Sequence, residues 1–214
     1  DVARDFAPIT QMVSLPNVLV VGMGTPFRTF GDFLSAARAK PGALTYGSAG
    51  LGTAPHMAME LLRVSANIDV LHVPYTGVAP ALNDIIGGRV DSMLVNFLSA
   101  KPQIDGGTLR ALAMSSASRS RFMPDLPTIS ESGVPGYEAI QWFGLLAPAG
   151  TPQPIIDRLQ SETAKILDTP AMKARLALEG AEPIGNSPAE FSALIKAEMA
   201  KWSQVAKAAG IKPE

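Results

Sequence analysis

Hydrophobic positions follow two alternating periods along the first two thirds of the chain. Short runs rich in branched apolar residues, such as residues 17–21, favour strands, and between them apolar residues recur at helical spacing. The first helical pattern ends at Pro41-Gly42 and is predicted to bury Phe30, Phe33, Leu34 and Ala37. Strands that alternate with helices at this spacing indicate βαβ units and a parallel sheet.

Two further helices follow glycine-containing turns. Thr53 is a favourable N-cap for the first, with Pro55 in its first turn, and its predicted buried face is Met57, Leu61 and Val64. The second helix ends at Gly87-Gly88 and is predicted to bury Leu82, Ile85 and Ile86.

The pattern changes after residue 119. A proline-rich connection is followed by a long apolar strand over residues 137–147 and then by helices to the C-terminus. The first of these helices is predicted to bury Ile155, Ile156, Leu159 and Ile166, and Ser187 caps the last one. Two long strands, residues 13–21 and 137–147, thus bracket one α/β unit. This pattern predicts a chain that enters a lobe and later leaves it.

Composition excludes several classes of protein. The chain of 214 residues has 18 Lys and Arg against 19 Asp and Glu, so it lacks the basic surface that nucleic acid requires. No apolar run approaches the roughly 18 residues of a membrane span. Cysteine is absent, and the two histidines, His56 and His72, lack zinc-site spacing. We therefore predict no disulfide, no metal and no cofactor.

The sequence "TYGSAGLGT" raises the main functional question. Gly47 and Gly52 have the spacing of a P-loop, but Thr53 stands where its lysine must be. A Rossmann fingerprint would require another glycine spacing and a later acidic residue, where this chain has His72. Ser48 lies in Y-G-S-A-G and not in the G-x-S-x-G of a nucleophile elbow. Nucleotide binding and serine catalysis are both disfavoured.

The remaining interpretation is an anion site. Glycines let the backbone approach a ligand, and the start of a helix offers unpaired N–H groups and a partial positive charge. The next turn, Tyr75 to Gly77, repeats this arrangement, and the third strand ends at Asn96. Three loops at one sheet edge favour a bound carboxylate. A purely structural turn, with His56 as a capping or packing residue, is the alternative.

Several longer motifs resemble those of a known protein family. "KPGALTYGSAGLGTAPHMAMELL", "DVLHVPYTGVAPALNDIIGGRVDSMLVN" and "PDLPTISESGVPGYEAIQWFGLLAPAGTP" closely resemble the Bug family, the TctC-like extracytoplasmic solute receptors of tripartite tricarboxylate transporters. The resemblance covers essentially the whole chain. It implies an α/β fold of the periplasmic binding protein type (type II, Venus flytrap) with two lobes. It also implies a periplasmic receptor, not an enzyme, that delivers a small organic carboxylate to integral membrane transporter subunits.

The resemblance also implies a ligand site. Its contacts would be Ser48, Ala49, Gly50, Gly52, Thr53, His56, Tyr75, Thr76, Gly77 and Asn96. The position of Thr76 is often lysine or arginine in similar sequences. The pocket is therefore expected to hold one cation fewer and to prefer a less charged acid.

Chains of the family begin well before a segment like "DFAPIT", with a secretory signal and the start of a first lobe. We therefore expect residues 1–18 to be a crossing segment, 19–140 the second lobe, and 141–214 a return strand and helices of an incomplete first lobe. Two alternatives remain at this point: the effector domain of a LysR-like transcription regulator, and a small hydrolase that uses Ser48.

Overall fold

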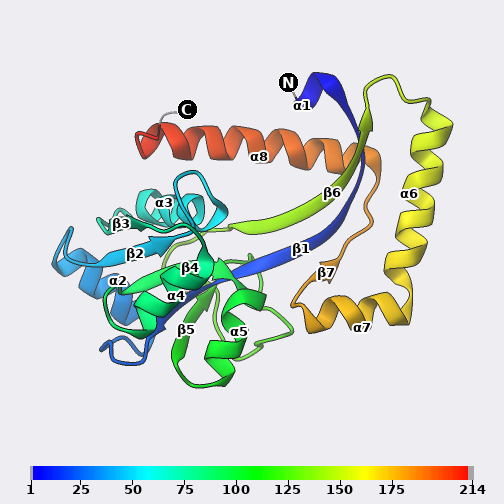
Figure 1. The fold of residues 1–214 in the computed structure, drawn as a ribbon. Coiled ribbons are helices and arrows are strands. Elements are labelled where there is room, and N and C mark those ends of the chain that lie inside the picture. The colour runs from blue at the N-terminus through cyan, green and yellow to red at the C-terminus, as the bar shows by residue number, and fades with distance from the viewer. Residues whose placement is uncertain (1, 212–214) are drawn as a thin grey trace. The chain divides into compact units, whose positions relative to one another are not determined.

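The structure is a computed structural model that describes residues 2–211, and Figure 1 shows its helices and strands. In chain order the elements are α1 (Val2–Asp5), β1 (Phe6–Gly22), α2 (Phe30–Ala39), β2 (Thr45–Ser48), α3 (Ala54–Ala66), β3 (Leu71–Pro74), α4 (Val78–Ile86), β4 (Ser92–Asn96), α5 (Phe97–Asp105), β5 (Leu109–Met114), β6 (Ile140–Pro148), α6 (Gln153–Asp168), α7 (Pro170–Leu178), β7 (Glu182–Pro183) and α8 (Pro188–Ala208).

The chain divides into two compact units. One contains the N-terminal residues up to Leu15 together with Gln141–Ser203, and the other contains Pro16–Ile140 and the chain from Gln204 onward. In the first unit, β1 pairs with β6 and β7. The division into lobes at residues 19 and 140 stays a prediction.

The sheet of the second unit is mixed, with the strand order β3-β2-β4-β1-β5. β2 runs parallel to β3 and to β4, whereas β1 runs antiparallel to β4 and β5. The predicted all-parallel sheet is therefore wrong for β1. Strands that alternate with helices are parallel only when each helical connection carries the chain back to the end of the sheet where the previous strand began. The connection through α2 instead leaves β2 two strands from β1 and opposite in direction.

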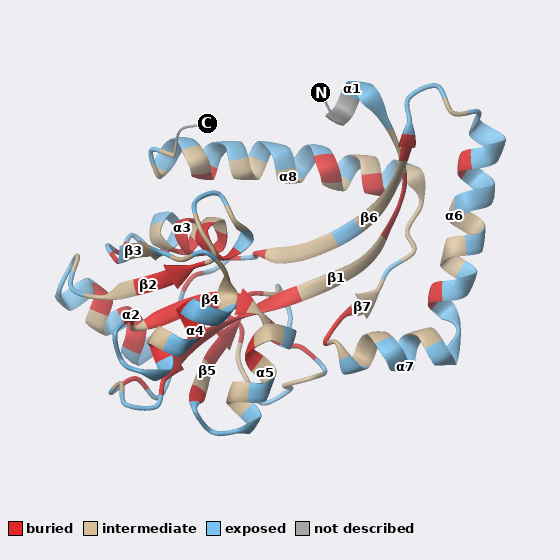
Figure 2. Cartoon of the chain, in the orientation of Figure 1, coloured by how far each residue is buried: buried red, intermediate tan, exposed pale blue. Residues whose placement is uncertain are grey.

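The core of the second unit lies on both faces of this sheet (Figure 2). Residues 18–21 of β1 and 93–95 of β4 are fully buried. The predicted face of α2, from Phe30 to Ala37, is buried and confirmed. On α4 the prediction holds for Leu82 and Ile85 and is wrong for Ile86, which is 40% exposed.

The predicted face of α3 is wrong. Val64 is exposed, and the helix instead buries Ala58, Met59, Leu62 and Ala66 together with two polar side chains, His56 and Glu60. An apolar pattern missed this face because its polar members have partners inside the protein.

In the first unit, α6 buries only part of its predicted face. Ile156 packs with Ile9 and Ala147, whereas the other predicted residues are exposed: Ile155, Leu159 and Ile166. The cap of α8 is confirmed, because Ser187 and Glu190 each accept a hydrogen bond from the other's backbone N–H.

The carboxyl ends of three parallel strands lie at one edge of the sheet in the second unit. β2 ends at Ser48, β3 at Pro74 and β4 at Asn96, and β2 lies between the other two. In open α/β sheets this edge is the usual place for a ligand.

Candidate functional site

The loop of residues 48–53, called the glycine loop below, joins β2 to α3. Gly50 has φ +125° and Gly52 has φ +71°, conformations that favour glycine. Thr53 is the N-cap residue of α3, as predicted, but its side chain donates to Gly50 O at 2.7 Å and does not cap the helix. The loop is therefore folded back on itself before the helix begins.

At least three N–H groups of the glycine loop are already used inside the protein, among them that of Thr53, which donates to Gly50 O at 3.4 Å. Gly50 N–H donates to Ser48 Oγ at 3.0 Å, and Gly52 N–H donates to His56 Nδ1 at 3.0 Å. The expected role of these two glycines in ligand contact stays a prediction. Their observed role is to set the backbone of the loop.

Four other N–H groups have no hydrogen-bond partner within residues 2–211. They belong to Ala49, Leu51, Ala54 and His56. Ala54 and His56 form the first turn of the thirteen-residue helix α3, where the helix dipole adds a partial positive charge. Neither residues 48–56 nor residues 75–77 include lysine or arginine. Anion binding here would depend on backbone N–H groups.

A serine–histidine pair lies directly behind the loop. Ser48 is fully buried, and its Oγ lies 2.6 Å from His72 Nε2 on β3. The parallel register of β2 and β3, which pairs Tyr46 with His72, brings the two side chains together. Sequence reasoning did not link them. The signal available was a histidine in the strand that follows the glycine loop.

His72 also stacks on the second histidine. The ring centroids of His56 and His72 are 4.2 Å apart with an interplanar angle of 22°, and Tyr46 stacks on His72 at 4.8 Å. Burial, followed by the charge of the neighbouring His56 ring, lowers the pKa of His72 to about 4. Burial also lowers the pKa of His56, although Glu60 opposes this shift. Both rings are therefore neutral at pH 7.

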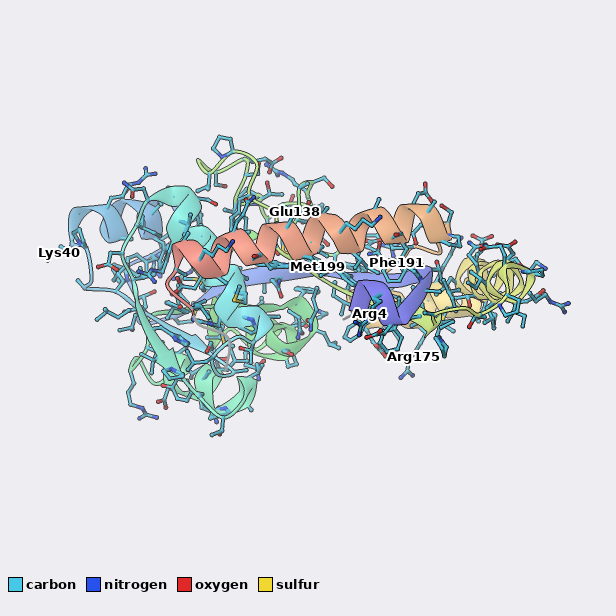
Figure 3. All side chains as sticks on the ribbon, turned by 90° about the horizontal axis from the view of Figure 1, so that it is seen from above. Arg4, Lys40, Glu138, Arg175, Phe191 and Met199 are labelled. Atoms are coloured by element: carbon cyan, nitrogen blue, oxygen red, sulfur yellow. The ribbon has the colours of Figure 1, made fainter. Side chains whose placement is uncertain are left out.

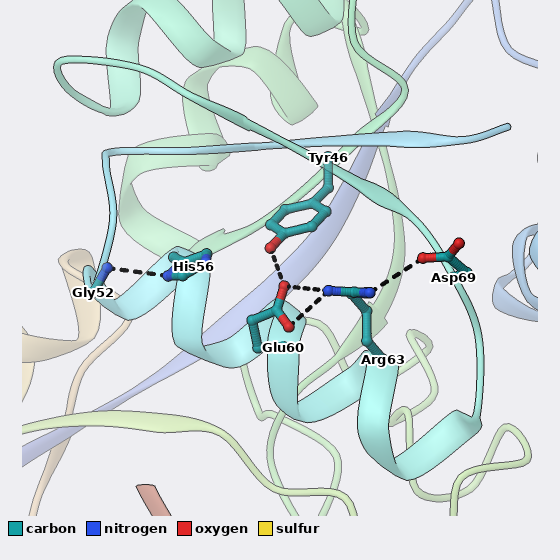
Figure 4. Close-up of polar contacts among 6 residues, drawn as sticks. All are labelled: Tyr46, Gly52, His56, Glu60, Arg63 and Asp69. Atoms are coloured by element: carbon teal, nitrogen blue, oxygen red, sulfur yellow. Dashed lines mark hydrogen bonds and ion pairs between the residues drawn. The ribbon is translucent and has the colours of Figure 1, made fainter. Parts of the chain in front are cut away.

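A series of polar side chains, buried at Tyr46 and Glu60 and exposed at Asp69, continues from this stack along α3 (Figure 4). The Tyr46 hydroxyl donates to Glu60, which is only 3% exposed, and Arg63 donates to both Glu60 oxygens at 2.8 and 2.9 Å. Arg63 also donates to Asp69 at 3.1 Å. Burial, then the hydrogen bond to Glu60, raises the pKa of the Tyr46 phenol. These hydrogen bonds and the stacked rings hold α3 and the glycine loop against β2 and β3.

Tyr75, Thr76 and Gly77 form the second predicted loop. Tyr75 N–H donates to Ser48 O at 3.1 Å, so this loop adjoins the glycine loop. The Tyr75 hydroxyl donates to Asp84 at 2.7 Å, and burial, then this bond, raises the pKa of Tyr75 to about 12. Thr76 is exposed, and Gly77 has the extended backbone that any residue adopts.

Asn96 has a local structural role. Its Oδ1 accepts from Ser99 N–H at 2.9 Å and caps α5. The ten predicted residues thus lie at the carboxyl ends of β2 and β4, in the loops that follow β2 and β3 and, for His56, in the first turn of α3. Their contact with a ligand stays a prediction.

Comparison with known proteins assigns the family. Residues 1–211 match the model of the tripartite tricarboxylate transporter family receptor, TctC. The chain belongs to this family, and the resemblance to it is confirmed. The family is one of solute-binding receptors and not of enzymes, so the pairing of Ser48 with His72 is not evidence of hydrolysis.

Individual relatives agree with this assignment. The chain is 40% identical over 94% of its length to the UPF0065 protein in the tcbD-tcbE intergenic region of a Pseudomonas species (strain P51), covering 60% of that protein. It matches the structure of R. palustris Rpa4515 with adipate at 39% identity and a TM-score of 0.87, covering all of this chain and 72% of that one. The structure of MatC from Rhodopseudomonas palustris with bound malate gives 30% identity and a TM-score of 0.78, covering 95% of this chain and 70% of that one.

The chain spans 60% and 65% of the length of two curated relatives. Among residues 2–211, no helix has the length and apolar content to span a bilayer. The same residues contain no group of three or more His, Asp or Glu side chains placed to hold a metal ion.

Proposed function

We propose that this protein is a periplasmic receptor that binds a small organic carboxylate through the glycine loop and delivers it to the membrane subunits of a tripartite transporter. The observation that carries the proposal is the set of four N–H groups, in the glycine loop and the first turn of α3, that have no hydrogen-bond partner among residues 2–211. A carboxylate accepts several such hydrogen bonds, and each is strengthened by its charge.

The relatives support the class of ligand. Two similar receptors were solved with adipate and with malate, which are small dicarboxylic acids. Thr76 supplies a hydroxyl, and residues 48–56 and 75–77 contain no lysine or arginine, so we propose an acid of low charge. The proposed contacts are the ten residues expected from the sequence, together with the N–H groups of Leu51 and Ala54. The ten are Ser48, Ala49, Gly50, Gly52, Thr53, His56, Tyr75, Thr76, Gly77 and Asn96.

A thermal-shift screen tests the proposal. The protein used contains this sequence and has the full length of its relatives. Adipate, malate and citrate are each added, with sodium chloride at matched ionic strength as the control. At about 100 times its Kd, a ligand stabilises the folded state by about 2.7 kcal/mol. In a protein of that greater length, this raises the melting temperature by roughly 4 °C. If none of the three acids raises it above the salt control, the proposal is wrong.

A further inference from the structure

The two histidines behind the glycine loop carry a further inference. Gly52 N–H donates to His56 Nδ1, so Nδ1 has no proton and the neutral ring of His56 carries its proton on Nε2. A second proton on this ring would therefore have to bind Nδ1. Protonated Nδ1 would point its hydrogen at the Gly52 N–H, and the hydrogen bond could not persist.

We propose that His56 holds the glycine loop in its observed shape only while its ring is neutral, and that proton uptake releases Gly52. His56 is then a positioning residue for the N–H groups of Ala49, Leu51 and Ala54. The inference rests on the proposed function only in treating this loop as the ligand site.

The surroundings of His56 determine the direction of the effect. The ring is 3% exposed and faces charged or titratable groups from three elements. These are Glu60 and Arg63 on α3, Tyr46 on β2 and His72 on β3. Burial disfavours the charged ring, and stacked His72 cannot take a second charge readily at 4.2 Å. The loop is therefore expected to keep its shape at neutral pH and to lose it as the pH falls below the ordinary imidazole value.

His72 makes the response of the pair sequential. His56 charges first, because the charge that it then carries lowers the pKa of His72. His72 Nε2 lies 2.6 Å from Ser48 Oγ, which in turn accepts from Gly50 N–H. Ser48 Oγ also donates to Gly50 O at 3.1 Å, so His72 adjoins the contacts of the other glycine of the same loop.

Nuclear magnetic resonance tests the inference without a ligand, so its outcome is independent of the proposed function. The imidazole nitrogens and the Gly52 amide are followed from about pH 8 to about pH 4, a range that includes the ordinary histidine pKa of about 6.5. We expect the Gly52 amide and His56 to shift with one shared midpoint below 6.5, and His72 to titrate lower, near 4. The Gly106 amide, which donates to the Pro102 carbonyl, is the control and should not follow that midpoint.

The variant His56→Asn separates positioning from packing. Its side-chain oxygen can accept the Gly52 hydrogen bond near the place of Nδ1 but cannot titrate. The Gly52 amide should then be insensitive to pH, and the midpoint of His72 should rise because the stacked charge is gone. A Gly52 amide that does not move in the wild-type protein overturns the inference, as does an unchanged Gly52 midpoint in His56→Asn. If the variant does not fold, the shared midpoint of the wild-type protein decides alone.

Discussion

Replacement of Gly144 by valine is expected to lower the free energy of unfolding of the first unit by about 3 kcal/mol. Gly144 lies on β6, and a Cβ atom there would come within 2.1 Å of Phe191 Cζ and within 2.9 Å of two further ring carbons. Phe191, labelled on α8 in Figure 3, is fully buried and packs edge-on against Trp142 at 5.4 Å. The ring cannot move aside without disturbing this packing. Chemical denaturation measures the loss.

Two further variants test this explanation. Gly24→Ala should be close to neutral, because no atom lies within 4 Å of a Cβ atom at that position. Phe191→Leu in the Gly144→Val background should recover part of the lost stability, because the smaller side chain leaves room for valine. A loss below about 0.5 kcal/mol for Gly144→Val would show that the contact is not as tight as described.

Gly52→Val in the glycine loop is expected to weaken ligand binding about tenfold or more. Gly52 has φ +71°, which strains a β-branched residue by roughly 1–3 kcal/mol. No atom lies within 4 Å of the added Cβ, so the loop changes shape and the core is undisturbed. Loss of one charge-assisted hydrogen bond corresponds to roughly 1.4 kcal/mol, or tenfold in Kd. Calorimetric titration of the full-length receptor measures the effect.

Gly88→Val is the matched control for Gly52→Val. Gly88 also has φ +71°, has no atom within 4 Å of an added Cβ, and lies in the turn between α4 and β4. Valine at Gly88 should therefore introduce a similar backbone strain and leave the Kd of the ligand unchanged. Gly52→Asn should retain most of the affinity, because asparagine tolerates this conformation. Equal affinity in Gly52→Val and the parent protein would mean that the loop is only a turn.

Sequence patterns predicted best those elements whose buried faces are purely apolar. The face of α2 is correct because Phe30, Phe33 and Leu34 have no competing polar neighbour on that side. The face of α3 is wrong because Glu60 and His56 occupy it. Those polar residues are buried through partners on other elements, Tyr46 and Gly52, which no periodicity can reveal.

The candidate site was likewise predicted only in part. The glycine loop was located from sequence because positive φ requires glycine at Gly50 and Gly52. The contact between Ser48 and His72 depends on the register of two parallel strands, and register is a tertiary property. Similarly, the direction of β1 depends on the end of the sheet at which the connection through α2 returns the chain.

The central claim is that backbone N–H groups of the glycine loop and of the first turn of α3 bind a carboxylate. Its most direct test is calorimetric titration of the full-length receptor with the dicarboxylic acid that stabilises it most, and separately with the dimethyl ester of that acid. The ester has nearly the same shape but no charge for the N–H groups of Ala49, Leu51 and Ala54. We predict that the ester binds at least about tenfold more weakly, the equivalent of one charge-assisted hydrogen bond. An ester that binds as tightly as its acid would contradict the claim.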